Sequence, residues 1–202
     1  MTASWNFGAG PACLPPAVLD RAQKALKDFQ NHGLSILELG HRTPQFAELV
    51  EALKNALKDA LQIPDDYTIL LSTGGASAHF AFIPLNVLAP GESADYLVTG
   101  HWSAKAAKEA QRFAPIRIAV DASQTEYVSV PEESTWTLNP AARYLHFVAN
   151  ETIHGVQFHK LPNIAKPLVA DMTSDILSKP VDVKRFGLIY ASAQKNLGIA
   201  GL

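Results

Sequence analysis

The sequence predicts an α/β fold in which helices flank a mainly parallel sheet. Apolar runs of strand length alternate with amphipathic stretches of helical spacing along the 202 residues, and this alternation is typical of parallel sheets. Polar or glycine-containing clusters follow several of the apolar runs directly. Parallel strands end at one edge of a sheet, so these clusters are expected to meet there and to form a ligand site.

The composition is that of an ordinary globular protein, with 48% hydrophobic residues, 18% charged residues and a formal net charge of −2. No basic cluster indicates nucleic-acid binding, and no apolar run reaches the roughly 20 residues of a membrane helix. The single cysteine, Cys13, excludes an internal disulfide framework, and the N-terminus lacks the pattern of a signal peptide. We therefore expect a cytoplasmic protein, and no residue pattern indicates a metal site.

Two amphipathic helices are expected in the first third of the chain. Proline suits the first helical turn, which places the start of one helix at Pro16 and of the other at Pro44, with Thr43 as the N-cap of the second. Between them, residues 35–39 are expected to be extended. Strands are expected at residues 67–72, 94–99, 117–120, 144–149, 167–171 and 187–191, with helices over 79–88 and 103–113 and a short strand near 127–128.

A pair of glycines marks a candidate phosphate site. Gly74 and Gly75 follow the first expected strand and lead through Ala76 and Ser77 into a helix. Glycines let backbone N–H groups approach an anion, and the positive end of the helix dipole favours it. The alternative is an ordinary turn without a ligand, and these residues alone favour neither.

Two further strand ends carry a carboxylate and a lysine. Asp171 closes one apolar run, and Lys195 follows the next. Burial lowers the pKa of a lysine, and a neutral amine can attack an aldehyde. A pyridoxal phosphate site needs such a pair: a lysine for the aldehyde and a carboxylate that keeps the pyridinium nitrogen protonated. The pattern becomes specific only together with a phosphate cradle and a residue that stacks on the ring.

Other candidates occupy similar positions along the chain. Trp102 lies at a strand-to-helix junction, where it could lie flat on an aromatic cofactor or serve as a core residue. Thr152 follows another strand and could donate a hydrogen bond to the cofactor or stabilise its own turn. His41 and Arg42 precede a helix N-terminus, which favours an anion, although a solvated turn is the simpler explanation.

Several short motifs across the whole chain resemble those of the phosphoserine aminotransferase family in order and spacing. They are Asn6–Pro11, Gly40–Arg42, Gly74–Ser77, His101–Trp102, Asn150–Gly155, Ala170–Leu177 and Ala193–Asn196. The resemblance implies the large domain of a fold-type I, class V transferase that depends on pyridoxal phosphate. It also implies amino transfer between glutamate and 3-phosphohydroxypyruvate, which gives phosphoserine and 2-oxoglutarate. A homodimer is the family's assembly, and bacterial members also serve pyridoxine synthesis.

The resemblance assigns roles by position. Lys195 would form the Schiff base with the cofactor and move the substrate proton, and Asp171 would pair with the pyridinium nitrogen. Trp102 would stack on the ring, and Thr152 would bond the ring oxygen. The remaining assignments are the cofactor phosphate for Ala76, Ser77 and Gln194, and the distal anion of the substrate for His41 and Arg42.

The chain also departs from the family pattern. Ser77 stands where several members carry a larger basic residue, which leaves the contacts to the substrate's phosphate open. His79 and Asp175 stand where members often carry Gln and Asn. The family continues well past its catalytic lysine. We therefore expect an arm over residues 1–15 that belongs with a small domain, and an incomplete cofactor-binding domain over residues 16–202 that is inactive alone.

Two alternatives stay open. Cysteine desulfurases and serine–glyoxylate-type aminotransferases share the fold and the Asp–Lys pair, but a desulfurase needs a cysteine on a mobile loop, and Cys13 is badly placed for that role. Outside enzymes, the chain could be a binding or dimerisation module that retains a cofactor pocket.

Overall fold

The computed structural model describes residues 5–202, and its contacts divide the chain into two compact units. One unit holds residues 5–8 and 12–70, and the other holds residues 9–11 and 71–202. The arm expected over residues 1–15 and the cofactor-binding domain expected over residues 16–202 stay predictions, and residues 1–4 of that arm lie outside the described residues.

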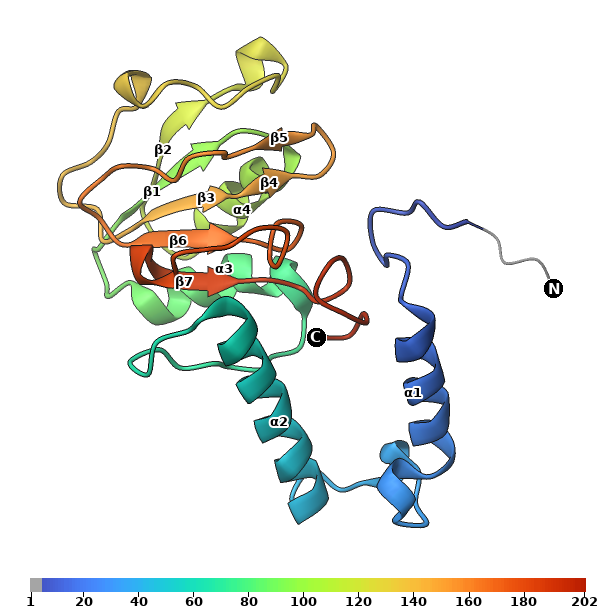
Figure 1. Cartoon of the computed structure of the whole chain (residues 1–202). Coiled ribbons are helices and arrows are strands. Elements are labelled where there is room, and N and C mark those ends of the chain that lie inside the picture. The colour runs from blue at the N-terminus through green and yellow to red at the C-terminus, as the bar shows by residue number, and fades with distance from the viewer. Residues whose placement is uncertain (1–4) are drawn as a thin grey trace. The chain divides into compact units, whose positions relative to one another are not determined.

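The first unit is helical. Its two α-helices, α1 (Pro16–Lys27) and α2 (Pro44–Leu61), both begin with proline as predicted (Figure 1). The Thr43 hydroxyl oxygen accepts the N–H of Phe46 at 3.4 Å and so caps α2. The extended piece expected at residues 35–39 is wrong: Ile36–Glu38 is a 3₁₀ turn, because the side chains of Ser35 and Glu38 form a capping box there.

The second unit contains a five-stranded parallel sheet, which confirms the predicted fold class. Its strands are β1 (Ala94–Val98), β2 (Ile116–Asp121), β3 (Leu145–Val148), β6 (Leu168–Asp171) and β7 (Phe186–Tyr190), in the order β2-β1-β3-β6-β7 (Figure 1). Strands β1, β3 and β6 are buried along their whole length, as expected for central strands of a parallel sheet. A small antiparallel pair, β4 (Asn150–Glu151) and β5 (Val156–Gln157), follows β3.

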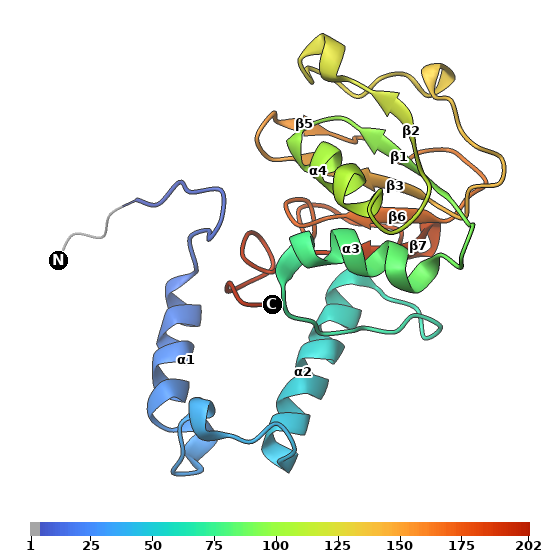
Figure 2. The ribbon, with the colours of Figure 1, turned by 180° about the vertical axis from the view of Figure 1, so that it is seen from behind.

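The two α-helices of this unit, α3 (Gly75–Val87) and α4 (His101–Ala110), lie on the same face of the sheet, which Figure 2 turns toward the viewer. Alanines on α4 bring its backbone close to β1, and α3 packs against α4 with larger apolar side chains. The buried cluster between helices and sheet includes Phe80, Ile83, Tyr96, Val98, Ala106, Ala107, Ala110, Tyr144 and Val169.

Two expected strands are absent from the described residues. Residues 67–72 belong to no strand, and the side chain of Leu70 is 82% exposed, so an apolar run that is not buried against a sheet does not become a strand here. The strand expected near residues 127–128 is wrong as well, because Glu126 and Tyr127 have φ angles of 52° and 57°, in the left-handed region. Both helices of the second unit begin earlier than predicted, at Gly75 and His101.

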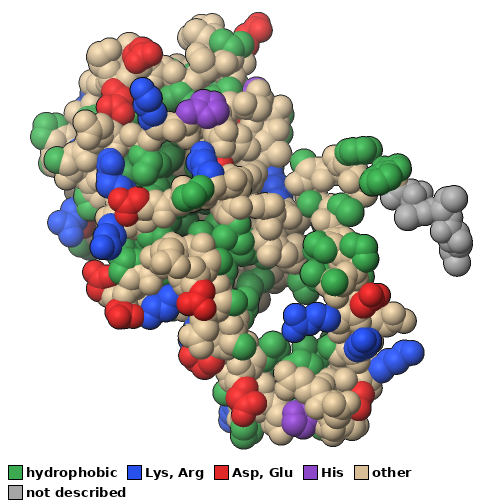
Figure 3. Space-filling model, in the orientation of Figure 1, with side chains coloured by type: hydrophobic (Ala, Val, Ile, Leu, Met, Phe, Trp, Pro, Cys, Tyr) green, Lys and Arg blue, Asp and Glu red, His purple; other side chains and the backbone are tan. Residues whose placement is uncertain are grey.

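The surface carries charges of both signs. Figure 3 shows acidic and basic side chains interspersed on the face in view, in keeping with the net charge of −2. Within residues 5–202 no helix is long and apolar enough to cross a membrane. The same residues contain no group of three or more His, Cys, Asp or Glu side chains that could hold a metal ion.

Candidate active site

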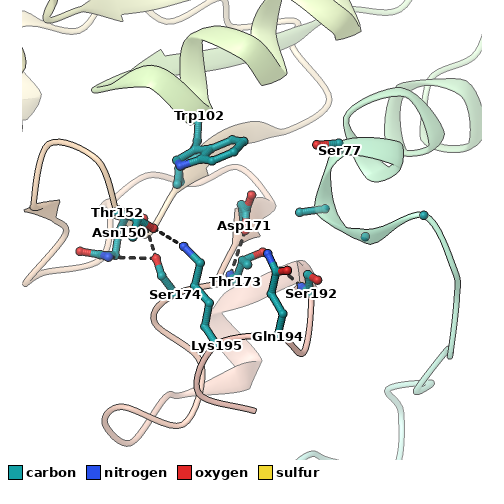
Figure 4. Close-up of a pocket in the computed structure, with 14 residues that line it drawn as sticks. Ser77, Trp102, Asn150, Thr152, Asp171, Thr173, Ser174, Ser192, Gln194 and Lys195 are labelled. Carbon is teal, nitrogen blue, oxygen red and sulfur yellow. Dashed lines mark hydrogen bonds between the residues drawn. The ribbon is translucent and has the colours of Figure 1, made fainter. Parts of the chain in front are cut away.

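A cavity of about 250 Å³ opens at the carboxyl ends of β3, β6 and β7, in the second unit. Its walls come from the starts of α3 and α4 and from the segments that end or follow these three strands (Figure 4). The lining residues are Gly74, Gly75, Ala76, Ser77, Trp102, Val148, Asn150, Thr152, Asp171, Thr173, Ser174, Ser192, Gln194 and Lys195. All residues that were predicted from the sequence to bind the cofactor therefore line this one cavity: Ala76, Ser77, Trp102, Thr152, Asp171, Gln194 and Lys195.

The start of α3 provides backbone N–H groups along one wall. Gly74 and Gly75 have φ angles of 92° and 61°, which other residues rarely adopt, and a Cβ at Gly74 would lie 2.6 Å from the Cβ of Ala78. The glycines thus turn the chain directly into the helix. The first-turn N–H groups of a helix, among them those of Ala76 and Ser77, have no partner within the helix and favour an anion.

Asp171 ends β6 and is nearly fully buried, with 4% of its surface exposed. Its Oδ1 accepts the backbone N–H of Thr173 at 2.9 Å, which fixes the carboxyl group at the floor of the cavity. Burial raises the pKa of Asp171, and hydrogen bonds from Thr173 together with the nearby charge of Lys195 oppose that rise. A cation placed in the cavity would lower this raised pKa.

Lys195 follows β7 and points into the cavity, where Nζ donates a hydrogen bond to Oγ1 of Thr152 at 2.5 Å. Desolvation lowers the pKa of Lys195, while the negative charges of Asp171 and Glu151 oppose this shift. The amine is therefore biased toward its neutral, nucleophilic form. This combination of a half-buried lysine and a nearby carboxyl group is the arrangement that the two strand ends predicted.

The segment 9–11 lies against this lysine. A Cβ at Gly10 would lie 2.9 Å from Cγ and 3.4 Å from Cε of Lys195. A side chain at position 10 would therefore push the lysine out of its place. Sequence reasoning assigned these residues to an irregular arm and did not connect them with the cavity.

Trp102 lies in the first turn of α4, across the cavity from Lys195 in Figure 4. Its backbone N–H donates to Oε2 of Glu151 at 2.9 Å, and Nζ of Lys105 lies 5.5 Å from the centroid of its ring. The ring thus has a fixed backbone anchor and an exposed cation beside it. Its position suits stacking on a flat ligand.

Sequence reasoning assigned no role to several polar residues of the cavity. Nδ2 of Asn150 donates to Oγ of Ser174 at 2.9 Å, and that hydroxyl donates to the backbone oxygen of Asn150 at 2.8 Å. The backbone N–H of Ser192 donates to Oγ1 of Thr173 at 3.2 Å. All four residues follow the ends of strands, and that position was the available signal.

His41 and Arg42 belong to the first unit and lie just before α2. Both side chains are exposed, and Nε of Arg42 donates to Nε2 of His41 at 3.4 Å. The cavity is lined by residues of the second unit. The role of His41 and Arg42 in substrate binding therefore stays a prediction.

Comparison with known protein families identifies the family to which this chain belongs. The family model described as aminotransferase class-V matches residues 4–202. The chain belongs to the class-V aminotransferase family. The resemblance seen in the motifs is thereby confirmed.

Curated relatives of this class-V aminotransferase carry the name phosphoserine aminotransferase. The one from Xanthomonas campestris pv. campestris is 46% identical over 203 residues, and the alignment covers all of this chain and 56% of the relative. The one from Azotobacter vinelandii is 49% identical over 200 residues, which cover 98% of this chain and 55% of the relative. The chain thus spans little more than half the length of the curated relatives it matches.

Solved structures agree with the sequence relatives. A structure described as phosphoserine aminotransferase from Bacillus circulans subsp. alkalophilus superposes with a TM-score of 0.92 at 44% identity, over 97% of this chain and 55% of that one. A pyridoxal-phosphate-bound phosphoserine aminotransferase from Trichomonas vaginalis gives 0.91 at 37% identity, over 98% and 56%. The predicted fold-type I architecture is therefore confirmed in the part of the enzyme that this chain spans.

Proposed function

We propose that the chain functions as a phosphoserine aminotransferase, which transfers an amino group between glutamate and 3-phosphohydroxypyruvate with pyridoxal phosphate as cofactor. The observation that carries this proposal is the convergence of Lys195, Asp171 and the start of α3 on one cavity. The names of the relatives, at 46–49% identity, support the choice of reaction.

The cavity offers a matching group for each part of pyridoxal phosphate. The first-turn N–H groups of α3 and the side chain of Gln194 suit the phosphate. The ring of Trp102 suits stacking, and the carboxyl group of Asp171 suits the pyridine nitrogen. A protonated ring nitrogen would supply the cation that would lower the raised pKa of Asp171.

When bound, pyridoxal phosphate supplies an aldehyde and a ring that accepts electrons. Lys195 presents its amine to the aldehyde because its pKa is lowered by desolvation. With the cofactor bound, the amine of Lys195 would act first as a base and then as an acid: it would take the proton from the substrate's Cα and deliver it to another carbon of the substrate–cofactor system. The Thr152 hydroxyl holds Nζ in the cavity, as its 2.5 Å hydrogen bond indicates.

The substrate side of the proposal rests on charge. The imidazole of His41 and the planar guanidinium of Arg42 are adjacent at the start of α2, and the guanidinium fork can bind either a carboxylate or a phosphate. We propose that they bind the distal anion of glutamate or of the phosphorylated keto acid. We further propose a cytoplasmic homodimer, in line with the family resemblance, and a second use in pyridoxine synthesis.

Borohydride trapping tests the cofactor site. The 202-residue chain is mixed with pyridoxal phosphate, reduced, digested and analysed by mass spectrometry, with Lys195→Arg as the control variant. We expect the label on Lys195, while exposed lysines such as Lys108 stay largely unmodified. Labelling spread evenly over the lysines would contradict the site assignment. The test does not depend on turnover, and the prediction that the 202 residues are inactive alone stays a prediction.

Turnover distinguishes the reaction classes. Amino transfer from phosphoserine to 2-oxoglutarate is expected from the proposed enzyme, whereas release of sulfide from cysteine would indicate a desulfurase that uses Cys13, the exposed cysteine. Because we expect the 202 residues to be inactive alone, turnover is measured on the chain extended to the full length of its relatives. Selective labelling of Lys195 with neither activity in that extended protein would favour a non-catalytic module or an enzyme with another amino acid substrate.

A further inference from the structure

One buried carboxyl group near the cavity has no role in the proposed chemistry. Glu151, in β4, has none of its surface exposed and does not line the cavity. Its Oε2 accepts the N–H of Trp102 at 2.9 Å, and its Oε1 accepts the N–H of Ser103 at 2.7 Å. A carboxyl group buried without exposure is costly unless its hydrogen bonds are satisfied, so these two contacts account for its position.

These contacts place Glu151 at the N-terminus of α4, although it lies 48 residues beyond Ser103 in the chain. The first N–H groups of a helix have no partner within the helix, and a negative charge there is favoured by the helix dipole. Glu151 thus caps α4 from another part of the fold. Because one of the capped groups belongs to Trp102, the cap fixes the backbone that carries the indole ring.

Gly100 makes room for this carboxyl group. A Cβ at Gly100 would lie 2.5 to 2.7 Å from Cδ, Cγ and Oε2 of Glu151. The φ of Gly100 is 176°, an extended conformation that any residue can adopt, so the need for glycine is one of space. The Ser103 hydroxyl closes the other side of this turn, since it accepts the N–H groups of Thr99 at 2.8 Å and Gly100 at 3.0 Å.

Glu151 is also joined to the opposite wall of the cavity. The next residue is Thr152, whose hydroxyl accepts the hydrogen bond of Lys195. Glu151 and its neighbour thus connect the ring of Trp102 on one wall with the amine on the other, which Figure 4 shows on the two sides of the cavity.

We propose that Glu151 is a positioning residue, which sets the indole of Trp102 at a fixed place relative to Thr152 and Lys195, and that Gly100 is small in order to admit it. The consequence for catalysis rests on the proposed function, because a stacking ring needs a flat cofactor. The positioning itself does not, and it can be measured without cofactor.

Fluorescence of Trp102 in cofactor-free protein tests the positioning. The background variant Trp5→Phe/Trp136→Phe leaves Trp102 as the single tryptophan. We expect Glu151→Ala to increase acrylamide quenching of Trp102 about two- to threefold and to shift its emission to longer wavelength, because a loosened helix start exposes the ring more often. Glu151→Gln keeps one acceptor oxygen, so its quenching of Trp102 is expected to lie between that of the background variant and that of Glu151→Ala. Unchanged quenching in both folded variants would overturn the proposal.

Asp95 offers a matched control. It is also a carboxyl group with none of its surface exposed, and it accepts the backbone N–H of Asn139 at 3.0 Å, but it does not line the cavity. We expect Asp95→Asn to lower thermal stability without changing the quenching of Trp102. Equal effects of Asp95→Asn and Glu151→Ala on Trp102 would mean that general loosening, and not positioning, is being measured.

A double-mutant cycle tests the role of Gly100. Gly100→Ala is expected to displace the carboxyl group and to raise the quenching of Trp102, as Glu151→Ala does. In the double variant the added methyl has no carboxyl group to displace, so its effect is expected to vanish. Additive effects would show that Gly100 acts independently of Glu151 and would overturn that part of the proposal.

Cofactor binding separates this inference from the proposed function. We expect Glu151→Ala to weaken binding of pyridoxal phosphate on the order of tenfold, the size expected for loss of a helix cap next to the site. If the unchanged protein fails to bind pyridoxal phosphate, the proposed function fails, whereas the quenching of Trp102 still decides the positioning role. If binding of the unchanged protein is selective and Glu151→Ala leaves both measurements unaltered, only the positioning role fails.

Discussion

At the scale of single residues, burial acts on Asp171 and Lys195 in opposite senses. It raises the pKa of the carboxyl group and lowers the pKa of the amine, because burial penalises the charged form of each. Their mutual attraction opposes both shifts. The pair therefore suits a ligand that places a positive charge beside Asp171 and reacts with the neutral amine of Lys195.

Asp171→Asn is expected to lower the pKa of Lys195 further. The charge of Asp171 raises that pKa in the intact site, so its removal leaves desolvation less opposed. Competitive acetylation of the cofactor-free protein across a range of pH measures the effect, because only the neutral amine reacts. An unchanged or higher midpoint for Lys195 would show that Asp171 does not act on it in this way.

The same variant is expected to raise stability at neutral pH. The folded-state pKa of Asp171 lies above its ordinary value of 3.8, so the folded state favours the protonated carboxyl group, and this contribution is lost as the pH rises above that value. Asparagine carries no charge to bury, and its oxygen can still accept the N–H of Thr173. Urea unfolding at pH 7 should give a higher free energy of unfolding for Asp171→Asn than for the unchanged protein. Near pH 3.5 this difference should be smaller.

Asp171 and Lys195 could be predicted from the sequence because their signal is local: each is a charged residue at or just after the end of an apolar run. It missed Glu151 and Gly10, whose importance comes from partners far away in the chain. The two backbone donors of Glu151 lie 48 and 49 residues earlier, and Gly10 meets Lys195 only in the folded structure. No local pattern contains this information.

At the scale of elements, the start of α3 depends on glycine for two separate reasons. Gly74 has a φ of 92°, and a Cβ there would also lie 2.6 Å from the Cβ of Ala78. Gly91 has a similar φ of 84° but no atom within 4 Å of its Cβ position. Alanine substitutions at these two positions therefore distinguish the effect of the left-handed backbone conformation, which both share, from the effect of the clash, which only Gly74 has.

Gly74→Ala is expected to lower the free energy of unfolding by about 2–4 kcal/mol, and Gly91→Ala by about 1–2 kcal/mol, because only the first adds a clash to the strain of the left-handed conformation. Urea unfolding of the two variants measures the difference. Equal losses would indicate that α3 shifts to relieve the clash, in which case we expect weaker binding of pyridoxal phosphate in Gly74→Ala alone.

Element boundaries followed from the sequence where local chemistry determines them. Pro44 and Thr43 predicted the start of α2 because a cap and a proline act within one turn. Residues 67–72 had the composition of a strand, yet a strand also needs burial against a sheet, and the side chain of Leu70 stays exposed. The 3₁₀ turn at residues 36–38 was signalled by Ser35 and Glu38, a capping box that an apolar run obscured.

At the scale of the whole molecule, the core of the second unit contains a histidine that stays neutral. His146 is 1% exposed, its Nε2 lies 2.8 Å from the hydroxyl oxygen of Tyr190, and its ring stacks on Tyr96 at 4.3 Å. Burial lowers the pKa of His146 to about 3, from an ordinary value of 6.5. The unfolded chain therefore takes up a proton at this residue well before the folded chain does.

His146→Phe is expected to reduce the loss of stability in mild acid. The contribution of neutral His146 is fully present above pH 6.5 and is lost as the pH falls from 6.5 toward 3, at up to about 1.4 kcal/mol per pH unit. Unfolding at several pH values in this window should give a shallower dependence for the variant, even though loss of the Tyr190 contact lowers its stability throughout. Parallel curves would mean that His146 does not titrate differently in the two states.

The parallel alignment of β6 with β7 sets Asp171 opposite Tyr190 and directs the following residues into one cavity. Successive side chains of a strand face opposite sides of the sheet. A slip of one residue between β6 and β7 would therefore place the side chains of Asp171 and Tyr190 on opposite sides. The turn that carries Lys195 follows β7 and reaches the cavity beside Asp171, so selective capture of an aldehyde by Lys195 reports that this strand pair has formed. Libraries of core variants could be sorted for correct folding by this reaction alone, without a substrate and without an assay of turnover.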